Sequence, residues 1–475
     1  MKRILIAAST FIFALHLEAQ TKFNPTSLPD NGVHRINPQV RGVWKCIGGG
    51  CILDATADTF KLYNYTDFSC YLETDDYTTN LLNSSSLFTF SNDTLNIYLH
   101  DFGSKSDDLQ SGKKFVRVSA LPKNCSVLTE SQQNDPAYLF DVFWHTLKEN
   151  YAFAKERNLD WDELYRLYKP KISRQTSKED LHKMMGEIVK LTKDHHTKII
   201  YKGKTLQYNE TPSAALLYEN FSRQDTLKDF DKYVNLFFKS TYEGISTDLL
   251  KGKGEKVANG KIEWGHLTAD IGYIHVFSFT GFASPNLSRK QHLDTLNSCM
   301  EPIMKAFQDK KAIIVDVSFN FGGYDAAGLT IAGYFTDKPV HVYDRYTFHK
   351  GKFYQDDKVY VQPADKYNFV KPVYVLTSDI SRSAAESFAM QMKALPNVKL
   401  VGSHTLGILS DMLGKSIGEY YLTQSNRKYS SPQGDVYEVS GVKPDIEIRV
   451  FDKKNMFFSH RQAVRKIEEM IDRAK

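Results

Sequence analysis

Residues 312–323 read AIIVDVSFNFGG, and residues 373–386 read VYVLTSDISRSAAE. Each stretch begins with a short apolar run, which is typical of a strand that is covered on both faces. The first then reaches Gly322 and Gly323, and the second runs into small and polar residues around Ser383. In α/β proteins the chemistry collects where such strands end. Both stretches are therefore candidates for a functional site.

Strands and helices alternate on both sides of these two stretches, which predicts a mostly parallel sheet with covered faces. We therefore expect an α/β core over residues 266–452 and a C-terminal helix over residues 453–475. The further segments behind this expectation are strands at residues 271–277 and 399–401 and helices at residues 288–309, 326–335 and 383–395.

The preceding part of the chain is predicted to be helical. Asp135 followed by Pro136, then Asp160 and Ser177, are residues that commonly begin helices, and apolar residues recur at helical spacing after each. We expect a helical subdomain over residues 131–200. Residues 201–265 are polar and weakly patterned, and we expect a lid or an inserted subdomain there.

The N-terminal part predicts export and a separate β domain. Residues 1–20 combine a basic start with an apolar run too short to span a membrane, which is the pattern of a secretory signal peptide. We expect this segment to be removed and the mature protein to be soluble, periplasmic or extracellular. Residues 21–130 contain short alternating runs separated by turns, which predict a small antiparallel β domain, a barrel or a sandwich.

Composition excludes several classes of protein. The chain has 475 residues, 41% of them hydrophobic, and a net charge of +5, which is too weak for a nucleic-acid partner. No later segment is long or apolar enough for a membrane span. Export makes disulfides in the β domain plausible, with the pairing left open. The candidate disulfide cysteines are Cys46, Cys51, Cys70 and Cys125.

Ser383 is the candidate nucleophile. It follows a buried strand at the start of a helix, where free N–H groups and the helix dipole favour a nucleophile and its oxyanion. Ser383 with Glu386 is equally a capping box, which is a purely structural feature. A serine nucleophile needs a base, and His195 and His196 stand out because they leave a helix directly after Asp194. Spacing alone does not select an orienting acid.

Five segments resemble motifs of the tail-specific, or C-terminal processing, serine peptidase family, in its secreted and tricorn-core-like branch. They occur in the family's order and cover roughly residues 135–450. The helical lead is similar to residues 140–151 and 160–161; L-x-x-D-G-H-T is similar to residues 191–197; I-x-D-x-R-x-N-x-G-G to residues 314–323; L-x-S-x-x-x-x-S-A-A-E to residues 375–386; and E-x-x-G-V-x-P-D to residues 438–445.

This resemblance implies a crotonase-like protease core that uses no metal and no organic cofactor. Ser383 matches the nucleophile, His196 the general base, and Glu438 the acid that completes the relay in the tricorn-like branch. The implied oxyanion hole consists of the amides of Gly323 and Ala384, with Gly322 as the neighbouring alternative.

The sequence departs from the family pattern in ways that affect the mechanism. The family's other branch has its catalytic lysine in a T-x-G-K segment, whereas residues 405–408 read TLGI, so a histidine mechanism is expected. His195 replaces the glycine of the D-G-H motif, and Ser318 replaces an arginine. Residues 198–270 lack the strand pattern of a PDZ domain.

The resemblance therefore predicts an exported serine endopeptidase that cleaves polypeptides through an acyl-enzyme. The alternative is a non-catalytic protein that binds peptides or apolar ligands on the same scaffold. The presence of Ser383, His196 and Glu438 together favours the enzyme.

Overall fold

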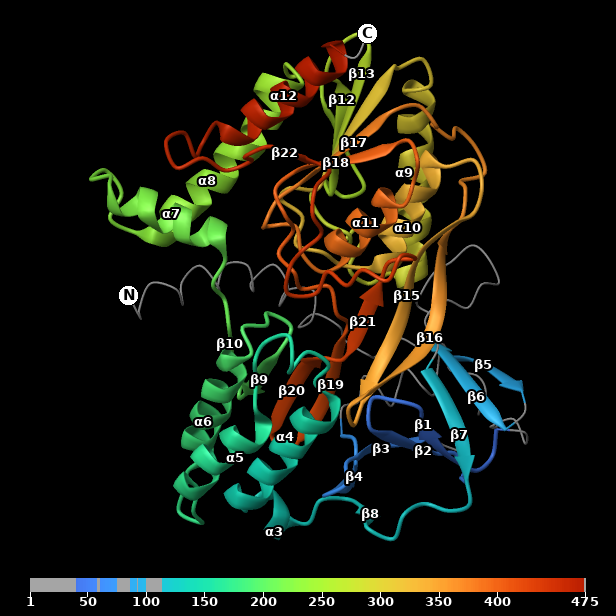
Figure 1. Ribbon diagram of the computed structural model, residues 1–475, viewed down its shortest axis with the longest axis vertical. Helices are drawn as coiled ribbons and strands as arrows, with labels where there is room; N and C mark the ends of the chain where they lie inside the picture. The colour runs from blue at the N-terminus through green and yellow to red at the C-terminus, as the bar shows by residue number, and fades with distance from the viewer. Residues whose placement is uncertain (1–39, 58–59, 75–85, 92, 100–112, 474–475) are drawn as a thin grey trace.

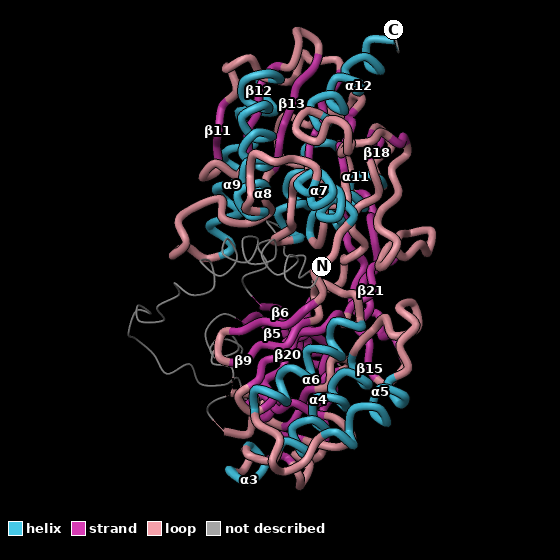
Figure 2. Tube along the Cα trace, turned by 90° about the vertical axis from the view of Figure 1, so that its left-hand side faces the viewer, coloured by secondary structure: helices cyan, strands magenta, loops and turns pink. Residues whose placement is uncertain are grey.

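The structure is a computed structural model, and it describes residues 40–57, 60–74, 86–91, 93–99 and 113–473. Figure 1 shows a core sheet with its helices at one end of the molecule. A second group of helices and the N-terminal sheet lie at the other end, as the turned view in Figure 2 also shows. The predicted signal peptide falls outside the described residues.

The core sheet has both faces covered, as the apolar runs predicted. Along β14, Ile313 and Val315 point into one apolar cluster, while Ile314 points into another on the opposite face. Helices α9 (Arg289–Ala306), α10 (Asp325–Ala332) and α11 (Ala384–Lys393) cover the first face. Helices α8 (Phe230–Gly244) and α12 (Ser459–Arg473) cover the second. The strand order is β11 (Glu255–Val257), β12 (Ile262–His266), β13 (Ile271–Val276), β14 (Ala312–Asp316), β17 (Val373–Thr377), β18 (Val398–Gly402) and β22 (Ile446–Glu447).

The sheet is parallel from β13 to β22, and β11 and β12 add to it in antiparallel fashion. These two strands come from residues 201–265, the stretch expected to form a lid. The sequence pattern did not predict these strands because a charged residue of β12, Glu263, is buried beside Ile262. The Glu263 carboxylate accepts a hydrogen bond from Ser246. In the rest of that stretch, α7 (Pro212–Ser222) and α8 are followed by a π-helix at Ile245–Leu249.

A second sheet carries the predicted helical subdomain. Helices α4 (Pro136–Asn150), α5 (Trp161–Tyr168) and α6 (Lys178–Leu191) share an apolar cluster with this sheet. Its strand order is β10 (Lys204–Gln207), β9 (Lys198–Tyr201), β20 (Tyr420–Ser425) and β19 (Met412–Ile417). Half of the sheet therefore comes from the stretch that was assigned to the protease core, because Leu422 and Tyr420 bury their side chains against the helices.

The N-terminal β region forms one sheet of eight strands, antiparallel except between β4 and β8. Helix α3 (Glu130–Gln133) follows it. The sheet runs in the order β5 (Ser86–Ser91), β6 (Thr94–Leu99), β7 (Lys113–Val118), β1 (Val43–Cys46), β2 (Cys51–Asp54), β3 (Lys61–Tyr65), β4 (Cys70–Leu72) and β8 (Cys125–Ser126).

Three strands connect the two ends of the molecule. The hairpin of β15 (Val340–His349) and β16 (Lys352–Val361) pairs with β21 (Arg427–Ser430), and these strands span the middle of Figure 1. The mixed α/β fold with an N-terminal antiparallel β region is the one expected from the sequence. None of the described helices has the length and apolar character that crossing a bilayer requires.

Candidate active site

Ser383 lies at a sharp turn between strand β17 and helix α11. Its backbone adopts φ 57° and ψ −126°, which is unusual for a residue other than glycine. Such strained turns between a strand and a helix expose the nucleophilic serine of α/β-hydrolases. Here the turn is fixed from both sides, because the Ser383 amide donates to the Ile408 carbonyl over 3.0 Å and the Arg382 amide donates to the Asn320 carbonyl over 3.2 Å.

The glycine pair after β14 lies directly against this turn. A Cβ on Gly322 would come within 2.7 Å of the Ser383 Cβ and 3.0 Å of the Ala384 nitrogen, so only glycine fits there. The Gly322 amide already donates to the Asn320 side chain over 2.8 Å, which removes it as an oxyanion donor. Among the described residues, the amides of Gly323 and Ala384 have no hydrogen-bond partner. These two N–H groups are therefore available to an oxyanion.

His196 lies in the turn between helix α6 and strand β9, and β9 belongs to the second sheet. Its Nδ1 is 2.6 Å from the Ser410 carbonyl oxygen. Because a carbonyl can only accept, Nδ1 carries the proton and Nε2 keeps its lone pair, which is the tautomer a general base needs. Burial lowers the pKa of His196 despite the nearby charge of Asp194, and this favours the neutral ring.

Glu438 binds the same loop as His196. Its Oε2 accepts from the amides of Leu409 and Ser410 over 2.8 and 2.9 Å, and its Oε1 accepts from Arg157 over 3.2 Å. The Glu438 side chain is only 2% exposed. Burial raises the pKa of Glu438 to about 8, and the charge of Asp194 adds to this rise.

Residues 408–410 therefore join the three predicted catalytic residues. Ile408 receives the Ser383 amide, and Ser410 binds Glu438 through its N–H and His196 through its carbonyl. Glu438 makes no hydrogen bond to the imidazole itself, and the Ser410 backbone connects the two side chains. The link between Glu438 and His196 is therefore made by the main chain of Ser410.

Asp194, the acid that directly precedes the two histidines, binds the chain around His196 and not its ring. Its Oδ1 accepts from the His196 amide over 2.8 Å, and its Oδ2 accepts from the Thr197 hydroxyl over 2.8 Å. Burial opposes its charge, but Arg157 and His196 outweigh that effect and lower the pKa of Asp194. Asp194 thus shapes the turn that presents His196.

The two other candidate bases, His195 and Lys415, bind groups away from residues 408–410. His195 Nε2 lies 3.2 Å from the Glu210 carbonyl, and burial lowers the pKa of His195 to about 3. Lys415, a buried lysine on strand β19, donates to the Gly50 carbonyl in the N-terminal sheet over 2.8 Å. Neither contacts residues 408–410.

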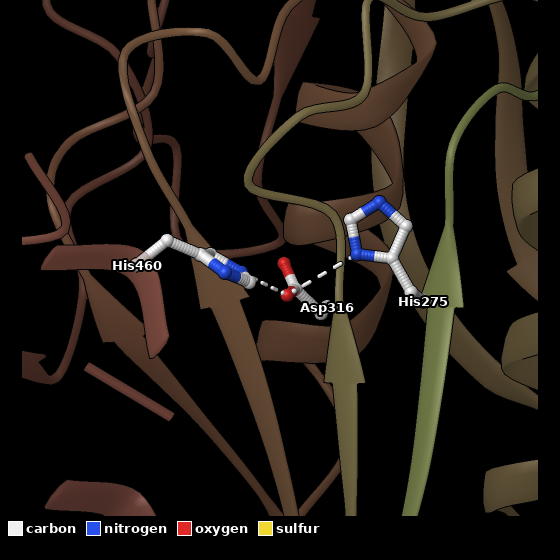
Figure 3. A group of neighbouring side chains, drawn as sticks. All are labelled: His275, Asp316 and His460. Carbon is white, nitrogen blue, oxygen red and sulfur yellow. Dashed lines mark hydrogen bonds and ion pairs between the residues drawn. The ribbon is translucent and has the colours of Figure 1, made fainter. Parts of the chain in front are cut away.

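The loop that carries the glycine pair begins at a buried polar cluster, drawn in Figure 3. Asp316 Oδ2 accepts from Tyr273 and from His460 Nε2, both over 2.6 Å, and lies 3.2 Å from His275 Nδ1. Its Oδ1 accepts from the Ser318 amide and hydroxyl. Although burial disfavours its charge, the neighbouring imidazoles hold the pKa of Asp316 well below its usual range.

Among the described residues, His275, Asp316 and His460 are the one group arranged so that it could hold a metal ion. Four hydrogen bonds already satisfy the Asp316 carboxylate, so the cluster is explained as an anchor between α12 and the loop after β14. Neither ring nitrogen of His275 is hydrogen-bonded. Ser318, which stands where the family has an arginine, completes this anchor.

Sequence reasoning missed Arg157, Ser410 and His460. Arg157 follows helix α4 in a turn with no motif, and Ser410 acts through its backbone, which carries no sequence signal. His460 lies 144 residues from Asp316. The one signal in the sequence was His460 itself, a polar residue within the apolar face of the final helix, α12.

The four N-terminal cysteines divide into one bridge and two thiols. Cys70 and Cys125 form a disulfide between β4 and β8. Cys46 and Cys51 are buried free thiols at the facing ends of β1 and β2. One of the two possible bridges is therefore present.

Comparison with known proteins identifies two domains. Residues 270–448 match the model of peptidase family S41, and residues 132–190 match the tricorn protease C1 domain. Ser383 and Glu438 fall within the first match, and His196 lies between the two. These matches make the chain a serine-type peptidase, a hydrolase that acts on polypeptides. It carries a peptidase family S41 domain preceded by a tricorn C1 domain.

Among the solved structures to which the chain is similar, one shares its fold at low sequence identity. A candidate peptidase from Parabacteroides merdae is 21% identical with a TM-score of 0.56, over 71% of this chain and 96% of that one. Mature CPAF complexed with lactacystin is 10% identical with a TM-score of 0.47, over 73% and 98%. The photosystem II D1 C-terminal processing protease is 13% identical with a TM-score of 0.40, over 70% and 97%.

Proposed function

We propose that this serine peptidase is an exported endopeptidase in which Ser383 is the nucleophile, His196 the general base and Glu438 the acid that positions the base. One observation carries the proposal. Hydrogen bonds from all three residues converge on residues 408–410, although the three are far apart in the sequence. A scaffold that only bound ligands would not require this convergence.

The proposed reaction proceeds through an acyl-enzyme. His196 Nε2 takes the Ser383 hydroxyl proton while Oγ attacks the scissile carbonyl carbon. The resulting oxyanion accepts hydrogen bonds from the amides of Gly323 and Ala384. The C–N bond then breaks, and the imidazolium returns its proton to the leaving amine. Water repeats the sequence on the ester, releasing the second product and free Ser383.

Glu438 takes part in this cycle indirectly, through Ser410. When His196 becomes an imidazolium, its Nδ1–H bond to the Ser410 carbonyl strengthens, because the donor is now charged. Glu438 fixes that carbonyl by holding the amide of the same residue, Ser410. We therefore assign Glu438 as a positioning residue.

Active-site labelling tests the nucleophile. A fluorophosphonate probe should label the wild-type protein at Ser383 and should not label Ser383→Ala, which should also lose peptide hydrolysis. Ser440→Ala, an exposed serine on the chain segment after Glu438, serves as the matched control and should behave like wild type. Full hydrolysis by Ser383→Ala would contradict the mechanism.

The choice of base is tested in the same way. His196→Ala should remove activity, whereas His195→Ala should keep a large part of it because His195 bonds to Glu210 instead. Activity that survives His196→Ala and is lost in Lys415→Ala would favour a lysine base.

Export and the domain division also belong to this proposal. The basic and apolar pattern of residues 1–20 supports cleavage of a signal peptide near residue 20. The mass of the protein recovered from the periplasm or medium should correspond to a chain that starts there. The proposed units are an N-terminal β domain over residues 21–130, a helical subdomain that also includes residues 412–425, and the protease core. Retention of the full chain in the cytoplasm would contradict export.

A further inference from the structure

Tyr429, on strand β21, lies between two carboxylates that come from different parts of the chain. Its hydroxyl oxygen is 2.7 Å from Asp325 Oδ2 and 3.0 Å from Asp411 Oδ1. Asp325 begins helix α10, two residues after Gly323, and Asp411 directly follows residues 408–410. The phenol of Tyr429 therefore connects the loop that presents the Gly323 amide with the segment on which the three proposed catalytic residues converge.

The number of hydrogens in this contact implies a shared proton. A phenol carries one hydrogen, and an ionised carboxylate can only accept. With Asp325 and Asp411 both ionised, Tyr429 could donate to one of them, and its other contact would place two oxygen lone pairs against each other. Tyr429 is only 2% exposed, so this conflict would lie in the interior. One added proton on Asp325 removes it, because Asp325 then donates to Tyr429 and Tyr429 donates to Asp411.

The charged neighbours favour this placement of the proton. Asp411 Oδ2 accepts from Arg427 over 2.8 Å, and although burial opposes the charge of Asp411, Arg427 and Arg345 lower its pKa. Burial and the charge of Asp411 raise the pKa of Asp325. Asp411 is thus the ionised member of the pair and Asp325 the protonated one. The remaining titratable groups around them come from β15 and β16: Tyr343, Arg345, Asp356 and Asp357.

Ser387 extends the link to the second oxyanion donor. Its hydroxyl oxygen lies 2.6 Å from Asp325 Oδ1 and 3.1 Å from the Ala384 carbonyl oxygen. Ser387 is fully buried on helix α11, one turn after Ala384. Asp325 is thus joined to Gly323 through the chain and to Ala384 through Ser387, so a single side chain connects the elements that present both oxyanion amides.

We propose that Asp325, Tyr429 and Asp411 share one proton, and that the resulting neutral Asp325 is a positioning residue for the oxyanion hole. Asp325 acts by joining the start of α10 to α11 and to the shared phenol. This inference rests on the proposed function, which assigns the oxyanion to the amides of Gly323 and Ala384. Neutrality suits the reaction, because a charged carboxylate two residues from Gly323 would oppose the negative charge that develops on the substrate oxygen.

Kinetics of matched variants test the role. In Asp325→Asn the amide NH2 can donate to Tyr429 and the amide oxygen can accept from Ser387, so this variant mimics the neutral acid. We expect it to keep kcat within about threefold of the wild type. Asp325→Ala removes both contacts and should lower kcat by about 10- to 100-fold while KM changes little, because the oxyanion forms only in the transition state.

Tyr429→Phe removes the shared hydroxyl and should lower kcat to a similar extent. Tyr165→Phe is the matched control, because Tyr165 donates to Asp141 over 2.9 Å in the helical subdomain and belongs to no part of the candidate site. It should keep the wild-type kcat. Circular dichroism and thermal unfolding check that each variant is folded. If Asp325→Ala does not fold, the comparison of Asp325→Asn with Tyr429→Phe decides.

Infrared difference spectroscopy tests the proton itself. The spectrum of the wild type minus that of Asp325→Asn at neutral pH should contain the carbonyl stretching band of a protonated carboxylic acid, and this band should shift in heavy water. Carboxyls that are unchanged in the variant, such as Glu438, cancel in the difference. A contact made by an ionised Asp325 would give carboxylate bands instead.

The outcomes separate this inference from the proposed function. Carboxylate bands in the difference spectrum, or an Asp325→Asn variant as slow as Asp325→Ala, would overturn the shared proton. Wild-type kcat in Tyr429→Phe would overturn the positioning role and leave the proposed function intact. Absence of any cleavage that depends on Ser383 would overturn the proposed function and the positioning role together, while the infrared band would still decide whether the proton is shared.

Discussion

Replacing Glu438 with glutamine removes the ionisable carboxyl from the candidate active site while keeping the shape of the side chain. In the wild type, Glu438 accepts from the amides of Leu409 and Ser410 at one oxygen and from Arg157 at the other. The amide oxygen of glutamine can keep the two main-chain bonds. Its NH2 group then faces Arg157, donor against donor. Glu438→Gln is therefore a close mimic of the wild-type protein with Glu438 protonated.

The size of the effect follows from the pKa of Glu438, which burial raises to about 8. If the ionised form is the active one, roughly a tenth of the protein is active at pH 7, and kcat/KM rises about tenfold between pH 7 and 9. His196 adds a second, lower limb, because burial depresses its pKa. In Glu438→Gln the limb near pH 8 should be missing, and kcat/KM at pH 9 should fall by a factor on the order of 10²–10⁴.

The assay is kcat/KM for a fluorogenic peptide across pH 5–10, with circular dichroism as the control for folding. Stability provides an independent check, since a carboxyl whose pKa is raised on folding stabilises the fold below its unfolded pKa of about 4.3 and loses that contribution as pH rises toward 8. The unfolding free energy of Glu438→Gln should lack this decline. A variant that folds and keeps the wild-type rate and pH profile would refute the positioning role.

Other changes test the neighbouring parts of the site. His196→Ala should lower the rate constant of acylation, measured in a single-turnover assay, by about 10³-fold or more, and raising the pH should restore little of this rate. A loss below tenfold would contradict the role of His196 as base. Gly323→Ala should destroy activity, because its Cβ would lie 2.4 Å from the Phe279 carbonyl carbon; Gly203→Ala, with φ +74° and open space, is the control for backbone strain alone. Cys70→Ser should lower the unfolding free energy by about 2–4 kcal/mol through loss of the bridge to Cys125, measured by urea titration, and no change would show that the bridge is absent in solution.

The sequence was sufficient for the core strands and for the position of Ser383 at the end of one of them. The apolar runs at β14 and β17 indicate buried strands. The glycine pair follows β14, and Ser383 follows β17. Local periodicity carries this information because each strand and its following turn are contiguous. The resemblance to a peptidase family was needed for His196 and Glu438, which lie far from Ser383 in the chain.

Contacts that depend on tertiary packing were not predictable from pattern. Residues 412–425 alternate like strands of any sheet, and only the packing of Leu422 and Tyr420 against helices α4 and α6 assigns them to the second sheet. The main-chain bridge at Ser410 leaves no trace in residue type, since any amino acid supplies an N–H and a carbonyl.

The anchor between α12 and the loop after β14 has a consequence for the timing of activity. His460, which binds Asp316, comes later in the chain than all three proposed catalytic residues. During synthesis, a chain that has grown past Ser383 still lacks both Glu438 and the helix that holds the start of the oxyanion loop. The proposed nucleophile is therefore synthesised before the residues that surround it. The candidate site is complete only after the final helix has been synthesised and has docked.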